Sequence, residues 1–394
     1  MLRPSRLLLG SLGILALLGC SDSYRNHGPA YGELVNGIAV ADIDGNGFPD
    51  ILGMVTTSVD GASSQGYVST RLQNSTGGYV LPTRFGVGRG PANLVVADVN
   101  GDGRPDLVVA NADDGTVSVR LADPAKPGFF LTAILLSTPG RTPLDVAVGD
   151  LNGDARMDIV VAASGANSVL VFTQTATGTF IAPVAYAVGG DPQAVTVADL
   201  DGNGLADMAV ATTANTVSVL LQSSAGVFAS AVDYTTGVQP IAIKAADLNG
   251  DGKLDLLTAN YGAAISPGKQ GLSVLLQGAA GTFAAPLHYT TDYRATALAV
   301  GDLNGDGKPD MVVACAGLPG APGAVCVFLQ DAATPGGLLP AVNYPGVYGP
   351  MGVAIADMDG DGHPDLVLAD GDIVVRFNDP TTPGTFGRPA FFFN

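Results

Sequence analysis

Short stretches in which apolar residues alternate with polar or small ones recur along the chain, separated by turn-forming residues. One unit of this pattern combines an alternating stretch such as 194–198, an apolar run such as 107–110, and a second alternating stretch such as 216–221. A Gly-x-Phe turn and a last extended stretch that often holds a tyrosine complete the unit. Alternation with a period of two, bounded by turn residues, is typical of β-strands. Each unit therefore predicts four strands.

A nine-residue motif marks each unit and occurs seven times. It has the form D-x-[DN]-G-[DN]-[GA]-x-x-D, and successive copies begin 48 to 56 residues apart. The seven copies begin at Asp42, Asp98, Asp150, Asp199, Asp247, Asp302 and Asp357. Four strands in about 50 residues, repeated seven times, predict an all-β fold: a seven-bladed β-propeller of four-stranded antiparallel blades. A parallel β-helix is the competing repeat architecture, although its rungs would be shorter than four strands.

The stretch before each motif indicates which strand lies at the centre of the ring. Before Asp150, positions 146 and 148 hold valine, whereas positions 147 and 149 hold alanine and glycine. A large face against a small face suits blades that converge on an axis. Lys244 interrupts the small positions. We expect its aliphatic stem to pack while its ammonium reaches the central channel; the alternative is that the ammonium contacts a ligand there. The seventh unit holds four strands of its own, so only 31–34 could add a closing strand.

The first twenty residues have the layout of an export signal. Arg3 and Arg6 precede an apolar stretch at 7–18, which is too short to span a bilayer, and Cys20 ends a Leu-Leu-Gly-Cys sequence. This ending resembles a bacterial lipobox, which implies a lipoprotein signal peptide at 1–19, a lipidated Cys20, a linker at 20–31 and the propeller at 32–394. An ordinary signal peptide with a chance cysteine is the alternative. We expect an exported protein anchored to the bacterial envelope by lipid alone, facing the periplasm or the cell surface.

The charge balance argues against nucleic acid as a partner and shows a strong preference for aspartate over glutamate. The chain has 36 acidic and 18 basic residues in 394, for a net charge of −18, and Glu33 is its only glutamate. Such an acidic surface disfavours nucleic-acid binding. Glycine and proline number 54 and 26, which fits a fold with many turns.

The motif places oxygen side chains at positions one, three, five and nine, with glycine at four and, in six copies, at six. Short carboxylates and amides alternating with glycine are what Ca²⁺ requires, with the carbonyl of position seven as a further ligand. Plain Asx and glycine turns without metal are the alternative. We expect up to seven structural Ca²⁺ ions. The proposed ligands are Asp42, Asp44, Asn46, Phe48, Asp50, Asp98, Asn100, Asp102, Arg104, Asp106, Asp150, Asn152, Asp154, Arg156, Asp158, Asp199, Asp201, Asn203, Leu205, Asp207, Asp247, Asn249, Asp251, Lys253, Asp255, Asp302, Asn304, Asp306, Lys308, Asp310, Asp357, Asp359, Asp361, His363 and Asp365.

The seven loops are not equivalent in charge or in backbone freedom. Six loops carry three aspartates, and the loop from Asp357 carries four. The loop from Asp150 has Ala155 where the others have glycine, and alanine resists a positive φ. We therefore expect the tightest binding in the loop from Asp357 and the weakest in the loop from Asp150.

Two cysteines remain in the body of the chain, Cys315 and Cys326, on either side of a glycine- and proline-rich turn. In an oxidising compartment, thiols on paired hairpin strands could form a disulfide. Two buried thiols that behave as small hydrophobic side chains are the alternative.

The seven motifs resemble the calcium loops of the FG-GAP and VCBS repeat family, whose propellers also occur in integrin α subunits. The resemblance covers 32–394. The Phe-Gly step is clear only at Phe85-Gly86 and Phe386-Gly387, which favours the bacterial VCBS-like branch. The family implies a secreted or surface-anchored propeller with structural Ca²⁺, used in adhesion or carbohydrate binding. It implies no shared catalytic residue.

The sequence offers little for catalysis, so we expect a monomeric binding or adhesion module for a protein or glycan. The alternatives are a polysaccharide lyase and a scaffold for another envelope protein. Three arginines recur eight to ten residues before a motif, which suggests a ligand face for anions or uronates, with ordinary surface loops as the alternative. The residues of this face are Arg89, Arg141, Asp292, Tyr293, Arg294 and Tyr348.

Overall fold

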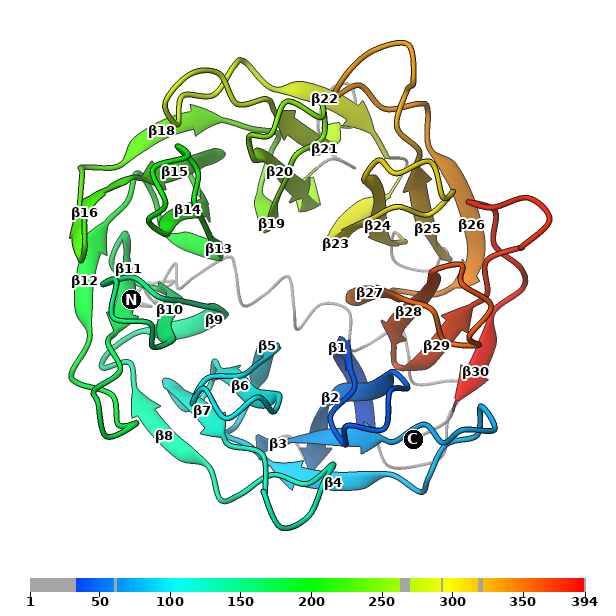
Figure 1. Ribbon diagram of the computed structural model, residues 1–394, viewed down its shortest axis with the longest axis horizontal. Coiled ribbons are helices and arrows are strands. Elements are labelled where there is room, and N and C mark those ends of the chain that lie inside the picture. Colours follow the sequence, from blue (N-terminus) through cyan, green and yellow to red (C-terminus); the bar gives the residue numbers. More distant parts are fainter. Residues whose placement is uncertain (1–32, 60–61, 263–269, 292, 318–321, 393–394) are drawn as a thin grey trace, which may run out of the picture.

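The computed structural model describes residues 33–59, 62–262, 270–291, 293–317 and 322–392. These residues form seven four-stranded antiparallel sheets arranged as blades around a central channel (Figure 1). The predicted seven-bladed β-propeller is therefore confirmed. Across the described part of the chain, no helix has the length and apolarity needed to cross a membrane.

Each blade is built from strands that are consecutive in the chain. Blades 1 to 3 contain β1 (Glu33–Ala41), β2 (Asp50–Val59), β3 (Ala62–Arg71), β4 (Thr83–Gly86); β5 (Pro91–Ala97), β6 (Asp106–Asn111), β7 (Thr116–Arg120), β8 (Ile134–Ser137); and β9 (Thr142–Gly149), β10 (Asp158–Ser164), β11 (Ser168–Phe172), β12 (Val184–Ala187). Blades 4 and 5 contain β13 (Pro192–Ala198), β14 (Asp207–Thr212), β15 (Thr216–Leu220), β18 (Val232–Thr235); and β19 (Pro240–Ala246), β20 (Asp255–Asn260), β21 (Gln270–Leu275), β22 (Leu287–Thr290). Blades 6 and 7 contain β23 (Arg294–Gly301), β24 (Asp310–Ala316), β25 (Gly323–Phe328), β26 (Val342–Val347); and β27 (Gly352–Ala356), β28 (Asp365–Asp370), β29 (Asp372–Arg376), β30 (Ala390–Phe392).

The Gly-x-Phe turn lies in the connection from the third to the fourth strand, which we call the return connection. In blade 4 it forms a small hairpin of β16 (Gln222–Ser224) and β17 (Val227–Phe228). In the other blades a single antiparallel bridge stands in its place, such as the bridge between Gln174 and Phe180.

The hydrophobic core is divided among the contacts between adjacent blades. Every residue of the second strands β6, β14, β20 and β28 is buried, because both faces of these strands lie against a neighbouring blade. One core cluster joins Val108 and Val117 of blade 2 to Val146 and Ile159 of blade 3. Equivalent clusters lie at the other six blade contacts. This arrangement explains the continuous apolar runs of the second strands.

Aromatic pairs repeat at the outer part of these contacts. Tyr234 in β18 meets Phe283 of the next return connection edge-to-face, with ring centroids 5.3 Å apart. Tyr186 with Phe228 and Tyr344 with Phe386 repeat the arrangement. The tyrosine and the Gly-x-Phe turn of the sequence pattern are thus two halves of one contact between blades, of a kind worth about 1 kcal/mol each.

The ring closes without exchanging a strand between its first and last blades. The sequence left 31–34 as the segment that could close the ring. Within the described residues, Glu33 and Leu34 of this segment belong to β1 and pair with β2 inside blade 1. The backbones of Val35 and Gly371 instead exchange two hydrogen bonds of 2.9 and 3.2 Å across the contact between blades 1 and 7. In Figure 1, β1 lies beside β27, the inner strand of blade 7, at this contact, which we call the seam.

Candidate functional site

The seven nine-residue motifs form loops, called here the acidic loops, at one end of the ring. Each begins after the inner strand of its blade and ends at the first residue of the second strand, as in blade 1 between Ala41 and Asp50. Because every blade repeats the same strand order, the inner strands run the same way along the channel and the acidic loops emerge together. The return connections emerge at this same end.

The first aspartate of each acidic loop organises the loop backbone. In blade 1, Oδ1 of Asp42 accepts the N–H groups of Gly45 and Asn46 at 2.8 and 3.0 Å, and Oδ2 accepts that of Gly47 at 2.7 Å. Gly45 and Gly47 have φ of 76° and 87°, which glycine adopts without steric cost. The first aspartates of the other loops accept equivalent bonds.

The last aspartate of each acidic loop is buried and anchors the return connection. Asp50 accepts the N–H of Ile43 at 2.9 Å and that of Gln73, 23 residues further along the chain, at 2.7 Å. All seven loops repeat this pair of bonds. The sequence indicated these aspartates only as metal ligands. Their second hydrogen-bond donor, a backbone N–H of the return connection, lies outside the nine-residue motif, so the motif alone does not show this bond.

Buried amides in the return connections join one acidic loop to the next. Nε2 of Gln174 in blade 3 donates to the carbonyl of Val99 in blade 2 at 3.1 Å, and Gln73 of blade 1 donates to Met358 of blade 7 at 2.7 Å. Asn378 and Gln330 reach back to Leu303 and Leu248 in the same way. A ligand that orders one acidic loop would therefore also support its neighbour.

Three acidic loops bring carboxylates close enough to share one cation. In each, one oxygen from each of three aspartates lies within 4.8 Å of the others. Two oxygens that bind the same Ca²⁺ at about 2.4 Å lie no more than about 5 Å apart, so these groups fit the ion. Among the described residues the groups are Asp42, Asp44 and Asp50; Asp199, Asp201 and Asp207; and Asp357, Asp359 and Asp361.

The last aspartate has a raised pKa in every acidic loop, because burial penalises its charged form. Burial, together with the neighbouring carboxylates of their loops, raises the pKa of Asp50, Asp207 and Asp365 to about 6. All three lie in the loops with the close carboxylate groups. At position five of the loop from Asp247, the hydrogen bond from Lys253 holds the pKa of Asp251 below its usual value.

The predicted ligand face lies at the end of the ring opposite the acidic loops, but its arginines contact protein groups there. Nε of Arg89 pairs with Asp114 at 2.6 Å. Nη1 of Arg141 donates to the hydroxyl of Ser168 at 2.6 Å.

Two other members of the face lie at the start of β23 and before β27. Arg294 donates to the Tyr261 hydroxyl at 3.1 Å, whereas Tyr348 is 59% exposed. Tyr293 is partly buried against the core of blades 5 and 6. Asp292 lies outside the described residues, as do Cys20 and the predicted signal and linker.

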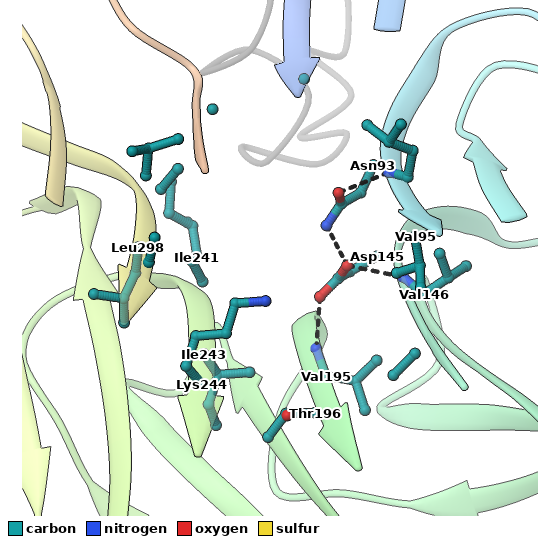
Figure 2. A pocket seen from close by; sticks show the side chains of 18 of the residues that line it. Asn93, Val95, Asp145, Val146, Val195, Thr196, Ile241, Ile243, Lys244 and Leu298 are labelled. Carbon is teal, nitrogen blue, oxygen red and sulfur yellow. Dashed lines mark hydrogen bonds between the residues drawn. The ribbon is translucent and has the colours of Figure 1, made fainter. Parts of the chain in front are cut away.

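The inner strands of all seven blades line a channel cavity of about 700 Å³. Asp145 in β9 is buried there, and its carboxylate accepts from the Asn93 amide of blade 2 and from the backbone N–H of Val195 in blade 4 at 2.8 Å (Figure 2). Lys244 points into the same space from β19. Sequence reasoning placed Lys244 near the channel but missed Asp145, because nothing in its own repeat shows that it joins three blades.

Cys315 in β24 and Cys326 in β25 are buried, with Sγ atoms 2.7 Å apart, and both are thiols in the structure. The disulfide stays a prediction, which counting alkylated thiols with and without reduction would test.

Comparison with known proteins places the repeats in a family. The model of the FG-GAP-like repeat matches residues 55–109, 98–161, 150–210, 199–258, 263–313 and 302–368, and the FG-GAP repeat matches 241–276. No curated protein matches the chain.

Solved structures share the fold at low identity. The structure of BBS1N in complex with ARL6DN, soaked with lead, is 13% identical with a TM-score of 0.56, and the match covers 91% of this chain and 97% of that one. A putative 6-phosphogluconolactonase from Bacteroides fragilis is 17% identical with a TM-score of 0.58, over 85% and 92% of the two chains. At such identities the likeness concerns the fold alone. The family models, which match most of the propeller, show that this chain belongs to the FG-GAP-like repeat family.

Proposed function

We propose that the protein is an exported, lipid-anchored binding or adhesion module whose propeller is stabilised by Ca²⁺ in its acidic loops. The observation that carries the proposal is the repeated acidic loop, which every blade places at one end of the ring, with three loops holding close carboxylate groups. Family membership supports this reading, since FG-GAP propellers are binding modules. Bound Ca²⁺ would supply the positive charge that these carboxylates lack, and the first and last aspartates would hold it while keeping their backbone contacts.

The end opposite the acidic loops is the better candidate for the ligand. Exposed Tyr348 offers an apolar ring, and Arg294 beside Tyr261 offers a planar cation. An arginine binds carboxylates through two parallel hydrogen bonds, and aromatic rings add contact area with a polar tip. This combination suits an acidic glycan or an acidic protein segment.

A glycan array with the calcium-loaded protein tests this assignment. Replacement of Arg89, Arg141 and Arg294 by alanine, or Tyr348→Ala, should abolish binding to uronate-containing glycans. Arg388→Ala, an exposed arginine outside this face, should leave binding unchanged. The thermal unfolding midpoint of each variant shows whether the variant is still folded, so that a lost ligand contact can be told from a lost fold.

Other outcomes of the array would change the proposal. Full binding by the triple variant would move the ligand away from this face. Release of shortened, unsaturated products from a bound glycan would show lyase activity instead. Binding to no glycan, with specific capture of an envelope protein, would favour the scaffold.

A further inference from the structure

The acidic loops differ at three positions that change together. Where position three is aspartate, position seven is uncharged in two loops and histidine in the third: Phe48, Leu205 and His363. Where position three is asparagine, position five is aspartate and position seven is always basic: Arg104, Arg156, Lys253 and Lys308. The first class is in blades 1, 4 and 7, and the second is in blades 2, 3, 5 and 6.

In the first class, the aspartate at position three faces the other carboxylates of its loop. In blade 1, Asn46 donates its amide to Asp44 at 3.1 Å and to the carbonyl of Gln73 at 2.8 Å. In blade 4, Asn203 repeats both bonds with Asp201 and Gln222 at 3.1 and 2.9 Å. The amide thus fixes the position-three carboxylate within the close group. In blade 7, Asp361 replaces this amide and brings a fourth carboxylate to the loop.

In three of the four loops of the second class, the carboxylate at position five pairs with a cation of its own loop. Nζ of Lys253 lies 3.1 Å from Asp251, and Nη1 of Arg104 lies 3.4 Å from Asp102. Arg156 pairs with Asp154 in the same way, and Lys308 holds the same position in blade 6. Close groups of three carboxylates, as far as the structure describes the chain, are found in the first class.

We propose that these two classes are two kinds of calcium site: the loops of blades 1, 4 and 7 bind Ca²⁺ tightly, and the basic side chain at position seven weakens binding in the other four. The proposal rests on the proposed calcium binding by this family of loops. A lysine or arginine at position seven changes the loop charge from −3 to −2, and in blades 2, 3 and 5 it pairs with the position-five carboxylate that would otherwise bind the ion. Repulsion of a divalent ion by one positive charge about 4 Å away in water corresponds to about 10- to 100-fold weaker binding.

The two classes also have a place in the ring. Blades 1 and 7 flank the seam, which no shared strand closes, and the carbonyl that accepts from Gln73 across the seam belongs to Met358 in the acidic loop of blade 7. Two of the three tight sites therefore lie beside the contact where, among the described residues, side chains and two backbone hydrogen bonds hold the ring closed.

Calorimetric titration of the chelator-stripped protein with CaCl₂, with elemental analysis of the product, tests the proposal. The expected result is three tight sites, and four sites at least tenfold weaker. Seven equal sites would overturn the two classes but keep calcium binding. No bound calcium would overturn the proposed function itself.

Reciprocal substitutions at position seven give a second test. Phe48→Lys introduces the cation into the loop of blade 1 and should reduce the tight sites from three to two, whereas Phe48→Gln should keep three. Phe48 is 36% exposed, so the protein should tolerate either change. Lys253→Gln should add a fourth tight site, and Lys244→Gln in the channel should not. Unchanged stoichiometry in Phe48→Lys and Lys253→Gln would contradict the role of position seven.

Discussion

At the residue scale, single side chains in this propeller do work that their local sequence does not reveal. Asp145 holds strands of three blades, and Asp50 and its equivalents join two connections of one blade. Both kinds of aspartate gain their role from partners distant in the chain. The acidic composition of the protein therefore reflects internal architecture as well as candidate metal sites.

Asp145→Ala should destabilise the protein by about 2–4 kcal/mol, because three donors, the Asn93 amide and the N–H groups of Val146 and Val195, lose their acceptor. Lys244→Ala is the control in the same channel. Its side chain is exposed, so the free energy of unfolding should change by no more than about 0.5 kcal/mol. Denaturant unfolding measures the free energy of unfolding of both variants. Equal losses in the two variants would contradict the role given to the hydrogen bonds of Asp145.

Ala155→Gly should raise the free energy of unfolding by about 1 kcal/mol. Ala155 has φ of 63°, a left-handed conformation that costs a side chain roughly this amount. Gly103→Ala is the converse change at the same loop position, where the backbone has φ of 81° and a Cβ would meet no atom within 4 Å. It should lower stability by a similar amount. Effects of the same sign in the two variants would refute backbone strain as the cause.

At the element scale, the strands and loops could be predicted from the sequence because their signals are local. Alternation, turn residues and the aspartate spacing all lie within one repeat. The contacts between repeats could not be predicted. Tyr234 and Phe283 were each visible in the pattern, yet their contact joins two blades, and the anchoring of Gln73 by Asp50 spans the whole of β2 and β3.

The acidic loops should make the calcium-free protein less stable as pH rises from 5 to 7. Asp50, Asp207 and Asp365 have pKa values of about 6 when folded, above the value of about 3.9 for an unfolded aspartate. The folded state therefore binds protons more tightly, and this stabilisation is lost as pH passes through 6. Groups with lowered pKa, such as Asp251, lose their contribution only at more acidic pH.

Thermal unfolding of the metal-stripped protein at pH 5, 6 and 7 checks this expectation. The midpoint should fall with increasing pH, and added CaCl₂ should remove the decline at pH 7 because the ion binds the ionised carboxylates. A midpoint that rises between pH 5 and 7 without calcium would contradict it.

At the scale of the whole molecule, the propeller is a ring of similar contacts with one that is distinct. The seam relies on the Val35 and Gly371 backbones, on Gln73 with Met358, and on Tyr79 against Phe392 with ring centroids 5.5 Å apart. How the ring closes could not be read from the sequence, because the last repeat already contains four strands. The acidic loops of blades 1 and 7 lie on either side of this contact, so calcium would support the ring where it is least continuous.

The central claim is that Ca²⁺ stabilises this propeller through its acidic loops. Its most direct test is the thermal unfolding midpoint of the purified protein in excess EDTA and then in millimolar CaCl₂ at pH 7. Three tight sites filled well above their dissociation constants should raise the midpoint by about 10 °C, with MgCl₂ giving much less. An unchanged midpoint, with no metal found by elemental analysis, would mean that the aspartates serve only the hydrogen-bonded turns seen in the structure.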